Sequence, residues 1–361
     1  KKFNFAAEKI IPDSFVFCVV LTLVVAVLSL TVCHIGPVEL LTSWWDGLSS
    51  QFTLAFQMGL MVVVCATCAR SPQVSKLLDG LSGLVHTRVA ALILLMAFGY
   101  VSSMLNWAFC TIVTPILAMQ LAKRVKGLHF PMMVAGGYCC MILGQCLGPS
   151  ATLYSNLATE GSNYAEIVGK TMTVAETCYN PVNVVLWVIL AVCFIVLVLF
   201  TQPGDDELVE LRSIATQADV APKDYQSREK ATTPAEKMNT CKPIMWVVGA
   251  AIFIYIIYSI ATKGFFATLN MNMVIFMFVG INCFLFPQPH SWMEAHTDSM
   301  HLATDVILQF PFYGAIMGMM YVEGGLGSVI VHAIVSVATA QTMPIFSFLS
   351  ACVVNLFIPS Q

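Results

Sequence analysis

The chain has 361 residues, of which 58% are hydrophobic and only 10% are charged, and its mean hydropathy is +0.81. An ordinary soluble domain carries about 25% charged residues. A water-facing surface cannot be built from so few charges at this length, which excludes a soluble enzyme, a nucleic-acid-binding protein and a disordered chain. The composition indicates an all-α polytopic protein embedded in a lipid bilayer, and the net charge of −3 adds nothing about its partners.

A membrane-spanning helix needs about 20 predominantly apolar residues. Seven stretches of this kind are predicted to span, in the order 14–34, 52–69, 131–150, 181–201, 243–262, 268–286 and 302–321. Two further apolar stretches differ. Residues 89–121 are too many for one span and are interrupted near 102–106, and the stretch from Met343 carries Asn355 and Pro359. We expect both to be re-entrant helical hairpins, the second over about 343–361, because non-helical backbone is tolerated at depth only when it is buried in protein or lines a wet cavity.

The basic residues define the orientation of these spans. With an inside N-terminus and non-crossing hairpins, the outer segments hold only Lys170 and Lys263 of the 17 Lys and Arg residues, which leaves fifteen inside. Such an asymmetry is what the positive-inside tendency predicts. Six of the fifteen lie in the one polar stretch, 202–242, which we interpret as a cytoplasmic connector rather than a regulatory domain.

The two halves of the chain repeat one order of elements. Gln57 and Gln309 lie in spans 252 residues apart, and Asn106 and Asn355 lie at hairpin tips 249 residues apart. Five crossings separate the two units, so the second unit is inverted relative to the first. Inverted repeats of this kind are typical of secondary transporters, whose sites lie where the repeats meet near the membrane midplane. The chain is thus divided into a first repeat (1–201), a linker (202–242) and a second repeat (243–361) that is incomplete at its C-terminus.

Four segments carry a family resemblance. Residues 105–109 (LNWAF), 309–313 (QFPFY), 325–327 (GLG) and 355–360 (NLFIPS) resemble signature segments of the bacterial short-chain fatty acid transporter family, within a similarity that runs from about residue 11 to the end. Ala108 and Cys110 replace glycines of the family pattern, and Gln361 stands where a further glycine is expected. The resemblance implies a homodimer in the bacterial cytoplasmic (inner) membrane, coupled to a cation and related to a wider ion-transporter superfamily with elevator-like motion.

A short fatty acid is a carboxylate with a small apolar tail, and no Lys or Arg lies within a predicted span to receive it. The remaining donors are amides, hydroxyls and the N-termini of half-helices, which carry free N–H groups and about half a positive charge. Five residues supply such groups, namely Ser102, Ser103 and Asn106 at one tip with Asn355 and Ser360 at the other. Carbonyls freed near Asn106 and Asn355 would hold co-transported Na⁺; alternatively, H⁺ arrives on the acid itself.

Other residues complete the predicted substrate and ion site. Gly148 and Ser150 belong to a Gly- and Pro-containing stretch that either interrupts a span facing the first hairpin or simply ends a helix. Gln309 either lines the pathway or ties spans together. Trp107, Phe310 and Phe312 would form walls for the acyl chain, and Pro359 follows the second tip.

Three other signals carry less weight. His290, His296 and His301 are spaced by six and five residues and do not share a helix face, so a zinc site is not expected. Cys65 and Cys68 form a CxxC that we interpret as structural. Asp305 is a minor candidate for proton coupling.

The sequence therefore predicts a cation-coupled carrier for short-chain monocarboxylates such as butyrate or acetoacetate, with no cofactor and no nucleic-acid partner. A carrier for di- or amido-carboxylates and a carboxylate channel stay open as alternatives. A membrane-embedded enzyme is not expected, because no convergent set of acid, base or metal ligands is present.

Overall fold

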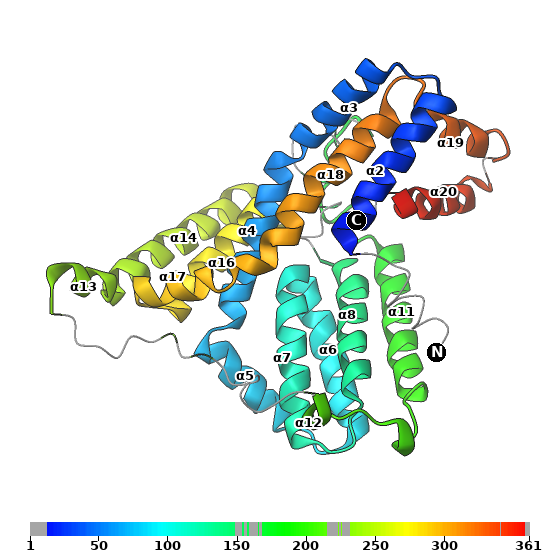
Figure 1. The fold of residues 1–361 in the computed structure, drawn as a ribbon. Coiled ribbons are helices and arrows are strands. Elements are labelled where there is room, and N and C mark those ends of the chain that lie inside the picture. Colours follow the sequence, from blue (N-terminus) through cyan, green and yellow to red (C-terminus); the bar gives the residue numbers. More distant parts are fainter. Residues whose placement is uncertain are drawn as a thin grey trace. The chain divides into compact units, whose positions relative to one another are not determined.

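The computed structural model describes residues 13–148, 154, 157–158, 165, 168–214, 223, 225, 232–339 and 341–357. The described residues form helices and no strand, as Figure 1 shows. The longer helices are α2 (Ser14–Thr31), α3 (Pro37–Ser50), α4 (Phe52–Ala69), α5 (Pro72–Ser82), α6 (Arg88–Leu105), α7 (Trp107–Arg124), α8 (Phe130–Gln145), α11 (Pro181–Phe200), α14 (Lys242–Lys263), α16 (Met271–Leu285), α17 (Pro289–Thr297), α18 (Thr304–Tyr321), α19 (Leu326–Val335) and α20 (Met343–Phe357). Short helical segments are η1 (Asp205–Glu207), α12 (Leu211–Ile214), α13 (Pro234–Asn239), α15 (Phe265–Thr268) and η3 (Met300–Ala303).

The described helices are those of a polytopic membrane protein. Six helical segments are long and apolar enough to cross a bilayer, namely Ser14–Thr31, Pro37–Ala69, Arg88–Leu105, Pro181–Phe200, Pro234–Lys263 and Met300–Tyr321. Large apolar side chains on some of them are exposed: in α14, Val247 and Ile254 are 69% and 67% exposed. Water would penalise this exposure, whereas a hydrocarbon solvent does not. The predicted all-α polytopic membrane class is therefore confirmed.

Local capping decides where the helices begin. Asp13 accepts from the Phe15 N–H at 3.0 Å to start α2, and Asn180 with Pro181 starts α11 in the same way. Asn270 caps α16 by accepting from the Met273 N–H at 3.0 Å, so this helix starts three residues later than the predicted span 268–286. Side-chain acceptors at N-caps satisfy amides that have no partner in the first helical turn.

The described chain divides into two compact units. Unit 1 comprises residues 1–59 and 303–361, and unit 2 comprises residues 60–302, so that α4 belongs to both. Unit 1 therefore combines elements from the first and the second half of the chain.

Unit 1 is built on close packing of α18 against α3 and α2. Gly314 and Gly318 lie four residues apart on α18, and a Cβ added at Gly318 would clash with the Ser43 carbonyl oxygen and approach the Gly47 Cα to 3.0 Å. Small residues at this spacing let two helix backbones approach closely, which replaces the hydrophobic effect as the source of packing in a membrane. The buried residues of the same unit include Cys18, Leu21, Val25, Ile316, Met319 and Met320.

Unit 2 contains a helical hairpin formed by α6 and α7. The chain reverses at Asn106, a single extended residue with φ −164° and ψ 133° that separates the two 18-residue helices. Arg88 at the start of α6 lies against Gly127, which follows the end of α7, so the two open ends of the hairpin are neighbours.

Small residues fit α8 against the hairpin. A Cβ at Gly99 of α6 would lie 2.9 Å from the Cys140 Cβ, and a Cβ at Gly137 of α8 would lie 2.7 Å from the Thr114 Cγ2. The hairpin and α8 thus form one tightly packed group of helices, and the Trp187 ring of α11 stacks edge-on to Tyr100 with 5.6 Å between ring centroids.

The polar linker is anchored at two places in unit 2, although its composition resembles that of a free connector. The Glu210 carboxylate accepts from the Gly127 N–H at 2.6 Å, next to the base of the hairpin. Lys223 forms ion pairs with Glu294 and Asp298 at 3.0 and 2.7 Å, beside the C-terminal end of α17. Tyr225 is 3% exposed and packs on Phe286. These described residues of the linker contact unit 2 although the average composition of the segment is polar.

Candidate functional site

Asn106 stands at the tip of the hairpin and is fully buried. Its Oδ1 accepts from the Ala108 and Phe109 N–H groups at 2.8 and 3.2 Å, so the side chain caps α7. From α4, the Cys65 thiol donates to the same oxygen at 3.5 Å, and the Asn106 amide donates to the Met61 sulfur at 2.9 Å. The Asn106 side chain therefore caps the N-terminus of α7, and its oxygen occupies two of the N–H donors of the first turn.

The two serines of the tip already donate their hydroxyl protons. The Ser102 hydroxyl donates to the Gly99 carbonyl at 3.1 Å, and the Ser103 hydroxyl donates to the Met141 carbonyl of α8 at 2.7 Å. Both side chains are at most 2% exposed. Ser102 thus bonds within its own helix and Ser103 ties α6 to α8, so both hydroxyl protons are engaged in this arrangement.

The indole nitrogen of Trp107 is a further donor at the tip. Trp107 is the first residue of α7, and its Nε1 is buried with no hydrogen-bond partner among the described residues. A buried donor left without a partner costs about 1–3 kcal/mol. The contrast is Trp187, whose Nε1 donates to the Leu143 carbonyl at 2.8 Å. A carboxylate oxygen at Trp107 would satisfy the indole N–H beside the positive end of the α7 dipole.

Opposite helix ends meet at Asn106. Its N–H closes the last hydrogen bond of α6, onto the Ser102 carbonyl at 3.0 Å, so the carbonyls of Ser103 and Met104 lie beyond that bond. The C-terminal end of a helix carries partial negative charge and the N-terminal end carries partial positive charge. The tip thus places the C-terminal carbonyls of α6 and the N-terminal N–H groups of α7 within one turn of helix, and two of these N–H groups already donate to Asn106.

The predicted residues of the stretch after α8 lie partly against this tip. A Cβ at Gly148 would lie 3.2 Å from the Ser103 carbonyl oxygen, and a Cβ at Gly144 would lie 2.6 Å from the Ser103 Cβ. Gly148 is buried after the end of α8 at Gln145. Ser150, Pro359 and Ser360 lie outside the described residues, as does the side chain of Asn355 within α20.

In unit 1, Gln309 ties helices together. Its amide donates to the Ser14 hydroxyl at 2.8 Å, and the Tyr313 hydroxyl donates to its Oε1 at 3.0 Å. These bonds join α18 to the first residue of α2. Of the two predicted roles for Gln309, the described contacts favour the structural one.

The two predicted aromatic walls differ in their surroundings. Phe310 packs against the buried core of unit 1 and stacks on Tyr313 with 5.9 Å between ring centroids. Phe312 lies edge-on to Phe15 and Trp44, at 5.3 and 6.1 Å. It also lines an apolar hollow of about 340 Å³ with Leu48, Phe52, Ala55, Phe56, Ile307, Leu308 and Pro311.

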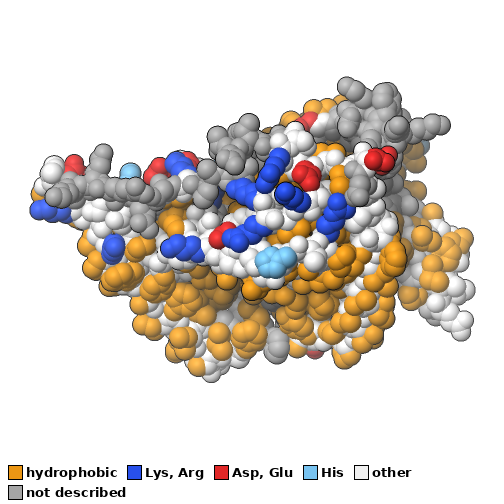
Figure 2. All heavy atoms as spheres, turned by 90° about the horizontal axis from the view of Figure 1, so that it is seen from below, with side chains coloured by type: hydrophobic (Ala, Val, Ile, Leu, Met, Phe, Trp, Pro, Cys, Tyr) orange, Lys and Arg blue, Asp and Glu red, His pale blue; other side chains and the backbone are white. Residues whose placement is uncertain are grey.

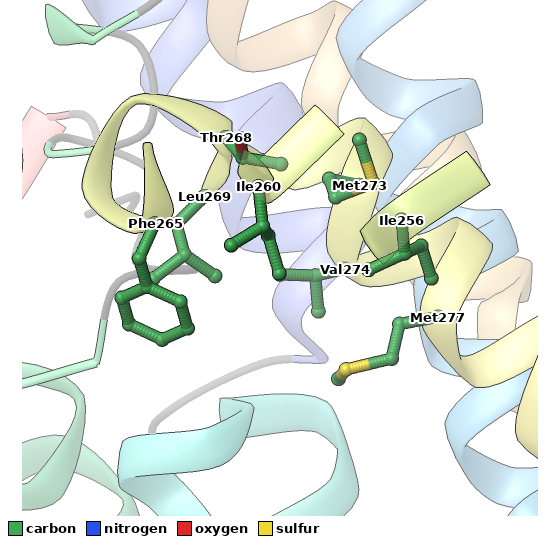
Figure 3. Close-up of a pocket in the computed structure, with 8 residues that line it drawn as sticks. All are labelled: Ile256, Ile260, Phe265, Thr268, Leu269, Met273, Val274 and Met277. Atoms are coloured by element: carbon green, nitrogen blue, oxygen red, sulfur yellow. The ribbon is translucent and has the colours of Figure 1, made fainter. Parts of the chain in front are cut away.

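Two hollows of unit 2 differ in their chemistry. The first, about 80 Å³, is lined by Ile256, Ile260, Phe265, Thr268, Leu269, Met273, Val274 and Met277 (Figure 3). Its one polar side chain, Thr268, already donates to backbone carbonyls, so it offers a carboxylate no donor. The second, about 380 Å³ at the C-terminal end of α14, is lined by Lys263, Ser259 and Asn272 among others and does offer donors.

Several histidine and cysteine residues of the patterns noted in the sequence have contacts in the described part of the chain. His296 lies 3.5 Å from the Thr67 hydroxyl through its Nδ1, and partial burial lowers the pKa of its imidazole. Its neighbours Glu294 and Asp298 are paired with Lys223. No group of three or more metal-ligating side chains occurs among the residues described, and the cysteines are free thiols.

Sequence reasoning did not identify Met61 or the Lys263 hollow. Met61 has no motif, because a thioether in an apolar span is indistinguishable from packing. Lys263 was visible only as one of two outer basic residues. Cys65 was noted as part of a CxxC, but its contact with Asn106 depends on how α4 packs on the hairpin.

The fold and this site define a class: a multi-pass helical membrane protein with an uncharged polar helix break buried inside it. The chain belongs to the short chain fatty acid transporter family, whose sequence pattern matches residues 1–361. A protein of Escherichia coli (strain K12) named "putative short-chain fatty acid transporter" is 28% identical over 97% of this chain and 78% of its own length. A protein of Haemophilus influenzae (strain ATCC 51907 / DSM 11121 / KW20 / Rd) with the same name is 27% identical over 98% and 79%. No solved structure matches the chain.

Proposed function

We propose that this protein is a secondary active carrier that takes up short-chain fatty acids, such as butyrate or acetoacetate, together with Na⁺ or H⁺. Family membership supports the substrate class. The observation that carries the proposal is the buried indole N–H of Trp107, which has no hydrogen-bond partner among the described residues and lies at a helix break formed by uncharged residues. Such a site suits a small monocarboxylate better than a dicarboxylate, whose second charge would need a further partner.

In the proposed mechanism, the carboxylate accepts from the Trp107 indole N–H beside the N-terminus of α7. Asn106 keeps that N-terminus in position through its two bonds to α7 and its contacts with α4. Phe109 stacks on Phe278 at 5.5 Å and provides an apolar surface for the acyl chain. Lys263 in its polar hollow attracts the anion before it reaches the tip.

The co-ion neutralises the substrate in a site that lacks fixed charge. Na⁺ would be held by the carbonyl oxygens of Ser103 and Met104 past the last bond of α6, because unwound carbonyls at helix C-termini are suited to Na⁺. H⁺ would instead enter on the acid, and the tip would then bind a neutral carboxyl group. Both alternatives keep net charge out of the apolar interior, where it is costly.

We further propose that the hairpin is re-entrant. Arg88 and Arg124 at its open ends stay at the headgroups, because charged side chains are excluded from the hydrocarbon. An 18-residue arm is about 27 Å long, against a hydrocarbon core of about 30 Å. The tip therefore lies at or past the midplane for any tilt up to about 50°.

Contacts within unit 2 support the proposed sidedness. The Arg70 guanidinium donates to the Tyr225 hydroxyl at 3.4 Å, and Lys223 pairs with Glu294. The sequence independently assigns Arg70, the linker and α17 to the cytoplasmic side. Their proximity requires an even number of crossings between residues 70 and 223, which two spans and a non-crossing hairpin provide. We propose accordingly that the N-terminus is cytoplasmic and the membrane is the bacterial inner membrane.

The repeated order of elements supports inverted repeats. Pro37 and Pro289 each begin a short helix, α3 and α17, and are 252 residues apart, the spacing of Gln57 and Gln309. A homodimer remains part of the proposal on the family resemblance alone.

The decisive experiment is uptake of labelled butyrate into proteoliposomes with the Na⁺ and pH gradients varied separately. We expect accumulation that one of the two gradients drives, together with saturable counterflow. Non-saturable flux without counterflow would instead show a channel. Competition by succinate at the same concentration as butyrate would show the alternative dicarboxylate carrier.

The hairpin tips are tested by Asn106→Ala and Asn355→Ala. Each is expected to abolish uptake while leaving membrane insertion intact. At Asn106 the reason is that uncapping α7 disorders the donors that face the substrate, and at Asn355 the expectation rests on the sequence. Uptake at the wild-type rate by both variants would contradict the assignment of the tips.

A further inference from the structure

A polar hollow of about 390 Å³ lies between α5 and α7, away from the hairpin tip. It is lined by Ser75, Lys76, Asp79, Gln120, Lys123 and Arg124. Two contacts join the helices here. The Gln120 Nε2 donates to the Ser75 carbonyl at 3.5 Å, and Arg124 pairs with Asp79 at 2.7 Å. We propose that this hollow binds the phosphate-bearing headgroup of an anionic phospholipid.

The charges of the hollow suit a phosphate. The carboxylate of Asp79 neutralises Arg124, whereas Lys76 and Lys123 form no ion pair with any described residue, which leaves two uncompensated positive charges. Figure 2 shows Lys and Arg side chains gathered on the face seen from below. Basic pockets between helices on the cytoplasmic side are suited to anionic headgroups.

A further unsatisfied group points to the rest of the headgroup. The Gln120 Oε1 is buried and has no hydrogen-bond partner among the described residues. This amide oxygen can accept a hydrogen bond from a ligand. A glycerol headgroup carries hydroxyl donors next to its phosphate. Phosphatidylglycerol therefore matches both the two lysines and the amide oxygen.

Apolar side chains beside the hollow distinguish a lipid from a soluble anion. Leu77 follows Lys76 on α5 and is 58% exposed, and Leu84 just after the same helix is 72% exposed. The opposite side of α5 is buried at Leu78 and Ser82. A helix with one buried side and exposed leucines beside a lysine is suited to the membrane interface. An amphiphile would satisfy the lysines and the leucines together, whereas free phosphate would satisfy only the lysines.

The test measures lipid binding by the full-length protein in a neutral detergent. Bound phosphatidylglycerol is counted by native mass spectrometry, and the shift in melting temperature is recorded with phosphatidylglycerol, phosphatidylcholine or glycerol 1-phosphate. We expect phosphatidylglycerol alone to bind and to raise the melting temperature. The Lys76→Gln/Lys123→Gln double variant should bind phosphatidylglycerol with an affinity about 30-fold lower, because it lacks two lysines that attract the anionic headgroup at the membrane surface.

Lys126→Gln is the matched control. The substitution removes the same positive charge from an exposed lysine just beyond α7, and Lys126 does not line the hollow. It should keep the wild-type affinity. Wild-type affinity in the double variant, or an equal loss in Lys126→Gln, would overturn the proposal. An equal shift with glycerol 1-phosphate would overturn the lipid as the ligand, since a soluble phosphate would then suffice. If the double variant does not fold, the single variants Lys76→Gln and Lys123→Gln are measured, each with an expected loss of about fivefold.

Discussion

Replacement of Trp107 by Phe removes the indole N–H at the hairpin tip and keeps an aromatic ring there. In the structure this N–H is buried and has no partner among the described residues, so the substrate-free protein loses no hydrogen bond. The substrate-bound protein does lose one, and a hydrogen bond to a charged group contributes about 1.5–3 kcal/mol. The expected result is an affinity for butyrate that is lower by a factor of about 10 to 150.

The assay combines butyrate uptake with thermal unfolding in detergent. Trp107→Phe should raise the KM for butyrate and leave the melting temperature within a few degrees of wild type, since it removes an unsatisfied donor at the cost of some packing. A structural role for Trp107 would give the opposite pattern, with a lower melting temperature and an unchanged KM.

Two other tryptophans are matched controls. Trp187→Phe deletes a bond of 2.8 Å to the Leu143 carbonyl and should lower the melting temperature without changing KM. Trp292→Phe also removes a buried Nε1 without a partner among the described residues, but on α17 rather than at the hairpin. An equal rise in KM in Trp292→Phe, or no rise in Trp107→Phe, would refute the assignment of the indole to the carboxylate.

Three further predictions concern packing, pH and substrate attraction. Gly318→Ala places a Cβ against the backbone of α3 and should sharply reduce the yield of folded protein. Gly80→Ala is the control and should be tolerated, because a Cβ there meets nothing within 4 Å. Equal yields of the two variants would contradict the packing argument. Hydrogen bonding to Lys223 holds the pKa of the Asp298 carboxyl below its usual value, so this linker contact is complete above about pH 4 and is lost as the pH falls through the lowered pKa. The rate of amide hydrogen exchange near Lys223 should therefore rise as the pH falls through that range. An exchange rate unaffected by the loss of the ion pair would show that the pair does not hold the linker. Lys263→Gln should raise the KM severalfold at low salt and not at about 0.5 M salt, where the Debye length is only a few ångströms; a salt-independent rise would show a direct contact instead.

Hydrophobic patterning determined most of the fold from the sequence. In a bilayer every spanning backbone must satisfy its own hydrogen bonds, so a long apolar run specifies a helix almost without tertiary context. The predicted spans 52–69 and 181–201 coincide with α4 and α11 to within one residue. The break at Asn106 was also predictable, because an amide in an apolar run is costly unless it caps a helix. These features depend on residues that are neighbours in the chain.

The partners of polar atoms could not be predicted in the same way. Ser102 and Ser103 have hydroxyls suited to an anion, yet both donate to carbonyls, because α8 and the preceding turn of α6 lie within reach. The sequence predicts Trp107 as an apolar wall, and only the structure shows that its indole N–H is buried without a hydrogen-bond partner among the described residues. The linker has the composition of a free segment, yet Lys223 anchors it to α17.

The sequence by itself determined that this is a helical membrane protein of the short chain fatty acid transporter family, where its helices lie and where one of them breaks. The tertiary structure decided which partners these donors find, such as the Met141 carbonyl of α8 for Ser103, and it left the Trp107 indole N–H without a partner among the described residues. The reason is physical: helix formation and membrane insertion sum over consecutive residues, whereas hydrogen-bond satisfaction at a buried site depends on atoms from helices far apart in the chain.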